Sequence, residues 1–306
     1  MNENRVEYLS HIGVMQKEIL SILEIVPPGI FIDATYGYGS HFRNIKSSYK
    51  KFNLYGFDRD IDSISNSSDK VYKLNFSEIP TFLKNNDIKN ISGILYDFGI
   101  SSHQVDSYVR GFSYINDGPL DMRMDTSNQI SAYTIINSYS VENLAKIFFE
   151  NGEEKNSKRI AKSIVENRPL SSTLELSGVI KSAITYKNPK FVMSTVKRCF
   201  QALRIYINNE LEEIEMSLNE ISKYISSNGV IICISYHSLE DRLVKNYFQK
   251  FTTGCICDPK IAVCLCSNKN LFNYGKKRKL TPSLNEIKSN SRSSSAILRY
   301  VVKNEN

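Results

Sequence analysis

Three aspartates, each directly after a short apolar segment, are the side chains of this sequence best suited to chemistry. The segments are 30–32, 54–57 and 93–96, and the residues that follow them are Asp33, Asp58 and Asp97. Each segment is short enough to be a buried parallel strand. Because the carboxyl ends of parallel strands share one edge of a sheet, and ligands bind there, we expect the three carboxylates to lie at one binding site.

A glycine-containing loop follows the first of these strands, with Gly37, Gly39, Ser40 and His41 in close succession. Glycines at this spacing let the backbone approach a ligand at a helix N-terminus. The dinucleotide pattern needs a third glycine where Phe42 stands, and a carboxylate just before the loop would repel a pyrophosphate. S-adenosylmethionine has no phosphate and carries cationic groups, so the loop favours that cofactor. A tight turn without a ligand is the alternative.

The other two aspartates have separate interpretations. Asp58 comes 19 residues after Gly39, at the strand end from which a carboxylate accepts hydrogen bonds from ribose hydroxyls. Asp97 begins a polar, glycine-containing loop of the kind that often carries function. For each aspartate the alternative is a helix N-cap.

Strand-like and helix-like segments alternate in the first hundred residues, and they must position the three aspartates and the glycine loop. This alternation predicts a mostly parallel sheet. From about 127 to 205 the apolar spacing is helical, as in 141–149, and predicts an insertion. One long helix is expected over 198–225. Strands at 230–234 and 296–302 then return the chain to the first domain.

The composition is that of a soluble globular protein of 306 residues, with 41% hydrophobic and 23% charged residues. We find no secretory signal and no apolar run of membrane-spanning length, which predicts a cytoplasmic protein with reduced cysteines. The net charge of +7 lies wholly in 255–306, which holds 10 basic and 3 acidic residues, whereas 1–254 holds 29 of each. Such a segment attracts a polyanion, or is simply a solvated tail.

Four cysteines form two pairs, Cys255 with Cys257 and Cys264 with Cys266. Four thiolates can hold tetrahedral zinc, but structural zinc sites usually space each pair by two or more residues. We therefore expect a reduced loop and no metal, with zinc as the alternative.

Several longer segments carry a specific resemblance: 97–106, 110–114, 119–125, 200–211, 235–242 and 290–299. Together they resemble the ribosomal RNA small subunit methyltransferase H family. The resemblance implies an α/β fold of the class I S-adenosylmethionine methyltransferase (Rossmann-like) type. The methyltransferase domain would comprise 1–106 and 206–306, and an inserted, mainly helical substrate-recognition domain would comprise 107–205.

The resemblance also implies an activity and a site. The family methylates the exocyclic N4 of a cytidine in the decoding region of 16S rRNA within the small ribosomal subunit, and relatives suggest a homodimer. The positions that match its S-adenosylmethionine contacts are Gly39, Ser40, His41, Asp58, Phe76, Asp97 and Gln104. Without the resemblance, Phe76 would be read as a core residue.

The sequence departs from the family pattern in the glycine loop, near the start of the chain and in the closing segment, where Ser291, Ser293, Ser294 and Ile297 replace proline, basic and small residues. Ser40 replaces a glycine, and serine fits there only if its φ is negative. Gly13 replaces a proline and loses the rigidity of that residue.

The proton acceptor for the reaction is left open among Asp97, Asp121, His237 and Asp241. A cytosine amino nitrogen is a poor nucleophile, so the enzyme must hold it in line with the methyl group and accept its proton. The helical insertion, Arg110, Arg123 and the basic run 276–279 are candidates for RNA recognition.

Three other functions remain open on the sequence. A nicotinamide oxidoreductase would share the sheet and Asp58, although the loop argues against it. A non-catalytic ribosome-assembly factor would bind RNA through the basic segment. A zinc-dependent nucleic-acid module would lose its fold in chelator.

Overall fold

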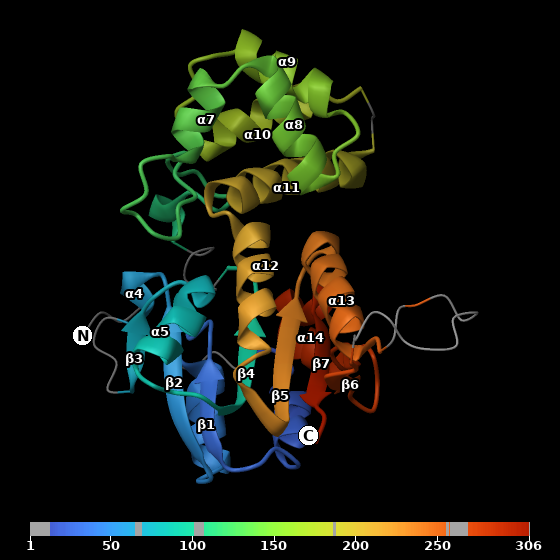
Figure 1. Ribbon diagram of the computed structural model, residues 1–306. Coiled ribbons are helices and arrows are strands. Elements are labelled where there is room, and N and C mark those ends of the chain that lie inside the picture. The colour runs from blue at the N-terminus through green and yellow to red at the C-terminus, as the bar shows by residue number, and fades with distance from the viewer. Residues whose placement is uncertain are drawn as a thin grey trace. The chain divides into compact units, whose positions relative to one another are not determined.

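The computed structural model describes residues 13–64, 69–100, 107–185, 188–254, 257 and 269–305. The chain divides into two compact units, which we describe separately (Figure 1). The first unit ends at Gly99 and resumes at Leu211, and the second is Ile100–Glu210. The insertion expected from the sequence at 107–205 lies within these limits of the second unit.

The first unit is built on a seven-stranded sheet of order β3-β2-β1-β4-β5-β7-β6. In that order the strands are Val71–Lys73, Phe52–Asp58, Gly29–Asp33, Ile91–Asp97, Ile225–Ser235, Ile297–Lys303 and Phe272–Tyr274. The pairs from β3 to β5 are parallel, and β7 is antiparallel to both β5 and β6. The sheet is therefore mostly parallel, and the three strands that end in aspartate are neighbours.

Helices pack on both faces of this sheet. Along β4 the side chains alternate, so that Ile94 and Tyr96 lie in one core and Leu95 lies in the other. The first core is covered by α5 (Ile79–Asn85), α12 (Glu210–Ile221) and α13 (Ser238–Thr252). The second core is covered by α2 (Gln16–Leu23) and α3 (Ser40–Ser48). Shorter elements complete the unit: α4 (Ile61–Ile64), η1 (Phe76–Glu78), α14 (Leu284–Ser289) and η3 (Ser291–Ser295).

The second unit is helical around one hydrophobic core. Its elements are η2 (Tyr108–Arg110), α7 (Ala132–Ser138), α8 (Val141–Gly152), α9 (Ser157–Glu166), α10 (Thr173–Ser182) and α11 (Pro189–Ile207). The side chains of Ser131, Ser140 and Ser172 accept hydrogen bonds at the starts of α7, α8 and α10. The buried carboxylate of Glu154 pairs with Arg198 of α11.

The prediction of one long helix over 198–225 is wrong, because α11 ends at Ile207 and α12 begins at Glu210. The helical spacing of apolar residues continues through the break, so the break cannot be recognised from that pattern. The side chain of Asn208 instead accepts a hydrogen bond from the Met124 amide at 2.7 Å and donates to the Met122 carbonyl at 2.8 Å. Asn209 then adopts a left-handed φ of 48°, which ends the helix.

Of the four cysteines considered for zinc, only Cys257 lies within the described residues. Among the helices that the structure describes, none is long and apolar enough to cross a bilayer.

Candidate functional site

The ends of β1, β2 and β4 bring Asp33, Asp58 and Asp97 to the same edge of the sheet. Asp33 is buried, and its Oδ1 accepts a hydrogen bond from the Thr35 amide at 3.3 Å. Its Oδ2 is buried with no hydrogen-bond partner among the described residues. Burial raises the pKa of Asp33 to about 7, although nearby His41 acts to lower it. A buried acceptor without a partner suits a ligand that brings a donor or a positive charge.

The glycine loop needs glycine at position 39. Gly39 has a φ of 74° at the start of α3, and a Cβ there would lie 2.5 Å from the Tyr36 hydroxyl. Ser40 is not among the residues of positive φ, so the serine causes no backbone strain. Its hydroxyl accepts hydrogen bonds from the Gly13 amide at 2.7 Å and from Gln16 at 3.0 Å. The departure from the family pattern at Ser40 is therefore accommodated.

Asp58 ties the glycine loop to the end of β2. Its Oδ2 accepts a hydrogen bond from the Gly37 amide at 2.6 Å, and its Oδ1 accepts one from the Asp60 amide at 2.8 Å. Burial is the main reason that the pKa of Asp58 is raised. Each carboxylate oxygen keeps a further lone pair, so Asp58 can accept hydroxyl donors while it holds the loop.

Asp97 is contacted through both of its carboxylate oxygens. The Tyr236 hydroxyl donates to Oδ1 at 2.7 Å, and Nε2 of His41 lies 3.3 Å from Oδ2. Burial lowers the pKa of His41, but the contact with Asp97 outweighs it and the pKa is raised above its usual value. The Asp97 side chain is 22% exposed and that of His41 is 7% exposed. Asp97 therefore remains accessible to a ligand, whereas His41 is buried and contacts the carboxylate from the protein interior.

Two of the four candidate proton acceptors are held by arginine. Asp241 is bonded to Arg299 through both oxygens, at 2.7 and 3.0 Å. In the second unit, Asp121 is bonded in the same way to Arg123, at 2.7 and 2.8 Å. Burial raises the pKa of Asp121, but the hydrogen bonds from Arg123 outweigh it, so that the pKa is lowered. Such bidentate pairs favour a structural role over proton transfer.

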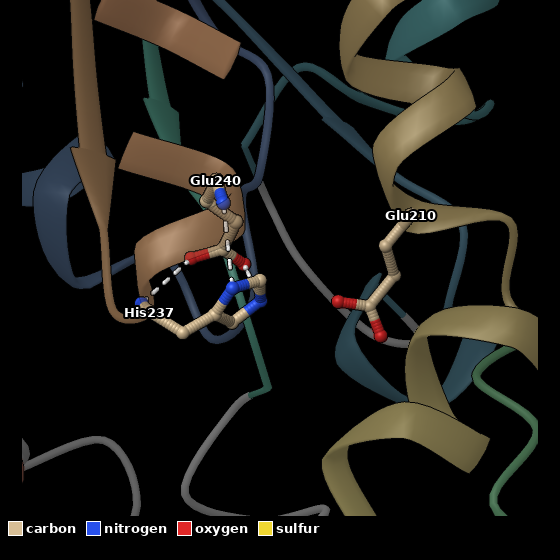
Figure 2. Close-up of side chains that lie close together, drawn as sticks. All are labelled: Glu210, His237 and Glu240. Carbon is tan, nitrogen blue, oxygen red and sulfur yellow. Dashed lines mark hydrogen bonds and ion pairs between the residues drawn. The ribbon is translucent and has the colours of Figure 1, made fainter. Parts of the chain in front are cut away.

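His237 is the N-cap of α13 (Figure 2). Its Nδ1 accepts a hydrogen bond from the Glu240 amide at 3.3 Å, and its Nε2 lies 3.0 Å from the Glu240 carboxylate. The same carboxylate accepts hydrogen bonds from the amides of Tyr236 and His237. Nδ1 thus serves the capping box and Nε2 lies against the same carboxylate, which also favours a structural role. Glu210, drawn in the same view, pairs with Arg204 of its own unit at 2.8 Å.

The remaining predicted residues are placed differently. Phe76 is 9% exposed and packs edge to face on Tyr96 and Phe98, as expected of a core residue. Gln104 lies outside the described residues. Arg110 is buried and donates to the carbonyls of Arg123 and Met124, so its guanidinium is committed inside the second unit and does not suit RNA contact.

Tyr236 is the residue of this site that the sequence analysis missed. It directly follows β5, which pairs in parallel with β4 and so ends at the same edge as Asp97. The rule that identified the aspartates, a polar side chain after a buried strand, applies to Tyr236 as well.

The polar groups of this edge fit S-adenosylmethionine. Carboxylates at three adjacent strand ends, an unpartnered buried oxygen on Asp33 and a backbone cradle at Gly39 suit a cationic nucleoside better than a phosphate-bearing one. The fold and this site define a class I S-adenosylmethionine-dependent methyltransferase.

Comparison with known proteins gives the family. The model of the MraW methylase family matches residues 8–304, and the chain belongs to that family. Proteins named ribosomal RNA small subunit methyltransferase H from Caldicellulosiruptor bescii and Caldicellulosiruptor saccharolyticus are 43% and 42% identical to it. The protein of the same name from Mycoplasma mycoides is 42% identical. Each of the three alignments covers 96% of this chain and 99% of the relative.

Proposed function

We propose that this protein transfers a methyl group from S-adenosylmethionine to the exocyclic N4 of a cytidine in the decoding region of 16S rRNA. The observation that carries the proposal is the meeting of Asp33, Asp58 and Asp97 at one sheet edge beside the glycine loop. The relatives named for small-subunit rRNA methylation, which align over nearly the whole chain, support the choice of substrate.

Each aspartate at this edge has a proposed role. S-adenosylmethionine supplies an electrophilic methyl group when it is bound. Asp58 accepts the ribose hydroxyls, and Asp33 and Asp97 place negative charge near the cationic groups. Asp97 is also the best candidate to accept the proton of the cytidine amino group, because Asp121 and Asp241 are neutralised by arginine and His237 caps α13.

An exposed basic surface near the C-terminus supports an RNA substrate. Lys276, Lys277, Arg278 and Lys279 are all exposed, and Arg278 lies over the Tyr274 ring at 4.9 Å. Between residues 269 and 305, nine basic residues accompany two acidic ones. Such a surface attracts the phosphate backbone. We assign recognition of further RNA to the helical unit, where α9 exposes Lys158, Arg159 and Lys162. The homodimer stays a prediction.

The direct test uses small ribosomal subunits from cells that lack the modification. We expect incubation with the protein and methyl-labelled S-adenosylmethionine to label one cytidine of 16S rRNA at N4, as mapped by nuclease digestion and mass spectrometry. A non-catalytic assembly factor would bind the same particles and leave them unlabelled. Label on another base or in the large subunit would refute the proposed target.

We expect the substitution of Lys276, Lys277 and Lys279 by glutamine to weaken binding to the small subunit about tenfold at 150 mM salt. The slope of log K against log salt should fall by about two to three, because three phosphate contacts are lost. Affinity for S-adenosylmethionine should not change. Arg278 is left in place because its guanidinium packs on Tyr274 and its carbonyl accepts a hydrogen bond from Arg299.

The control for that variant removes the same charge from another exposed part of the first unit. Lys50, Lys84 and Lys89 are exposed, and their replacement by glutamine should change RNA affinity by less than about twofold. Equal losses in the two triple variants would mean that only net charge matters and that 276–279 is not an RNA-binding surface.

A further inference from the structure

Tyr236 joins two neighbouring strands at the binding edge through a single hydrogen bond. β5 ends at Ser235, and its Ile234 lies opposite Asp97 in the parallel pair with β4. Tyr236 follows immediately and donates its hydroxyl to Oδ1 of Asp97 at 2.7 Å. A hydrogen bond to an ionised acceptor is stronger and more directional than one between neutral groups. The side chain therefore acts on the carboxylate that the proposed site depends on.

The backbone of Tyr236 is itself held in place. The Glu240 carboxylate, which is fully buried, accepts the Tyr236 amide at 2.7 Å and the His237 amide at 3.3 Å. On the other side Gly99 has a φ of 102°, and a Cβ there would lie 3.3 Å from the Tyr236 ring. The capping box of α13 fixes the backbone of Tyr236, and the absence of a side chain at Gly99 leaves room for the ring.

The second oxygen of Asp97 lies beside the imidazole of His41, in an ion-pair contact. Nε2 of His41 lies 3.3 Å from Oδ2, and this ring comes from α3, after the glycine loop. Burial, and then the charge of Asp97, raises the pKa of Tyr236 well above its usual value, so the phenol stays protonated and keeps donating. Asp97 is thus hydrogen-bonded through one oxygen by the residue after β5 and contacted through the other by a side chain of α3.

We infer that Tyr236 is a positioning residue that, together with His41, fixes the Asp97 carboxylate in the orientation that receives S-adenosylmethionine. A carboxylate with a hydrogen bond on one oxygen and an imidazole beside the other loses little rotamer freedom when a ligand binds, and its partial exposure leaves lone pairs for the cationic cofactor. The inference rests on the proposed role of Asp97 in the cofactor site. Tyr236 would touch neither the cofactor nor the base, and would act only through Asp97.

The test is a double-mutant cycle on the affinity for S-adenosylmethionine, measured by calorimetry with Tyr236→Phe, Asp97→Asn and the double variant. Tyr236→Phe keeps the ring that packs on Gly99 and removes only the hydroxyl. We expect it to weaken binding roughly 10- to 100-fold, as expected for loss of a hydrogen bond to a charged group. In the Asp97→Asn background the same change should alter the dissociation constant by less than about twofold.

Tyr247→Phe is the matched control, because it also removes a phenol that donates to a carboxylate, that of Glu215 at 2.9 Å. It should lower the unfolding midpoint and leave cofactor affinity unchanged. The inference is overturned if Tyr236→Phe leaves the affinity unchanged while Asp97→Asn weakens it, or if Tyr236→Phe weakens it equally in both backgrounds. If Asp97→Asn itself has no effect on binding, the proposed cofactor site is wrong.

Discussion

Replacing Asp97 with asparagine is expected to lower kcat/KM for methylation of the small subunit by about 100-fold or more. The amide keeps the size of the side chain but removes the charge, and one charge-assisted contact is worth about 1.5–3 kcal/mol. It also cannot take up a proton from the cytidine amino group. Asp97 is the candidate acceptor that is partly exposed and not paired with arginine or engaged in a helix cap.

Methyl incorporation at several cofactor concentrations separates the two roles of Asp97. Loss of cofactor binding alone raises the dissociation constant and leaves kcat at saturating cofactor unchanged, whereas loss of the proton acceptor lowers kcat as well. Asp241→Asn is the control, since it breaks the pair with Arg299 and should lower stability while leaving turnover of the folded protein within about threefold. If Asp97→Asn retained full turnover at all cofactor concentrations, the assignment of this edge would fail.

The sequence predicts the ends of β1, β2 and β4 well because the signal there is local. A short apolar run with an aspartate directly after it describes β1, β2 and β4, and each of these strands ends at the predicted residue, Asp33, Asp58 or Asp97. Because neighbouring parallel strands end at the same edge of a sheet, the three aspartates can be placed together before any side-chain contact is known. Strands of three residues, β3 and β6, carry too little apolar pattern to be recognised.

Contacts between distant residues are what the sequence does not reveal. Tyr236 and Asp97 are 139 positions apart, and Arg299 and Asp241 are 58 apart. Whether an aspartate is neutralised by arginine or remains accessible depends on these contacts, so the four candidate acceptors cannot be ranked from residue type. The break at Asn208 has the same origin, because the Asn208 side chain accepts a hydrogen bond from the amide of Met124, which is distant in the sequence.

The Asp33→Asn variant is expected to be more stable than the natural protein at pH 8, by about 2–4 kcal/mol, and no more stable at pH 4. The pKa of Asp33 is raised from 3.8 to about 7 in the folded protein. Between these values the unfolded chain has lost the proton that the folded chain keeps, so rising pH favours unfolding. Above pH 7 the folded protein must carry a buried charge whose Oδ2 has no partner among the described residues. Asparagine mimics the protonated form and removes this cost.

Denaturant unfolding of both proteins from pH 4 to pH 8 measures the effect as a difference that grows up to about pH 7 and then levels off. Asp87→Asn is the control, because it makes the same substitution at a side chain that is 87% exposed. The same Asp33→Asn variant should bind S-adenosylmethionine about tenfold more weakly, because a cationic ligand favours the ionised form. A variant that gained stability without losing affinity would mean that Asp33 lies at the edge but does not face the cofactor. If neither stability nor cofactor affinity changed, the buried carboxylate of Asp33 would have no part in the site. A residue that is retained for binding should instead give a variant that is more stable and binds the cofactor more weakly.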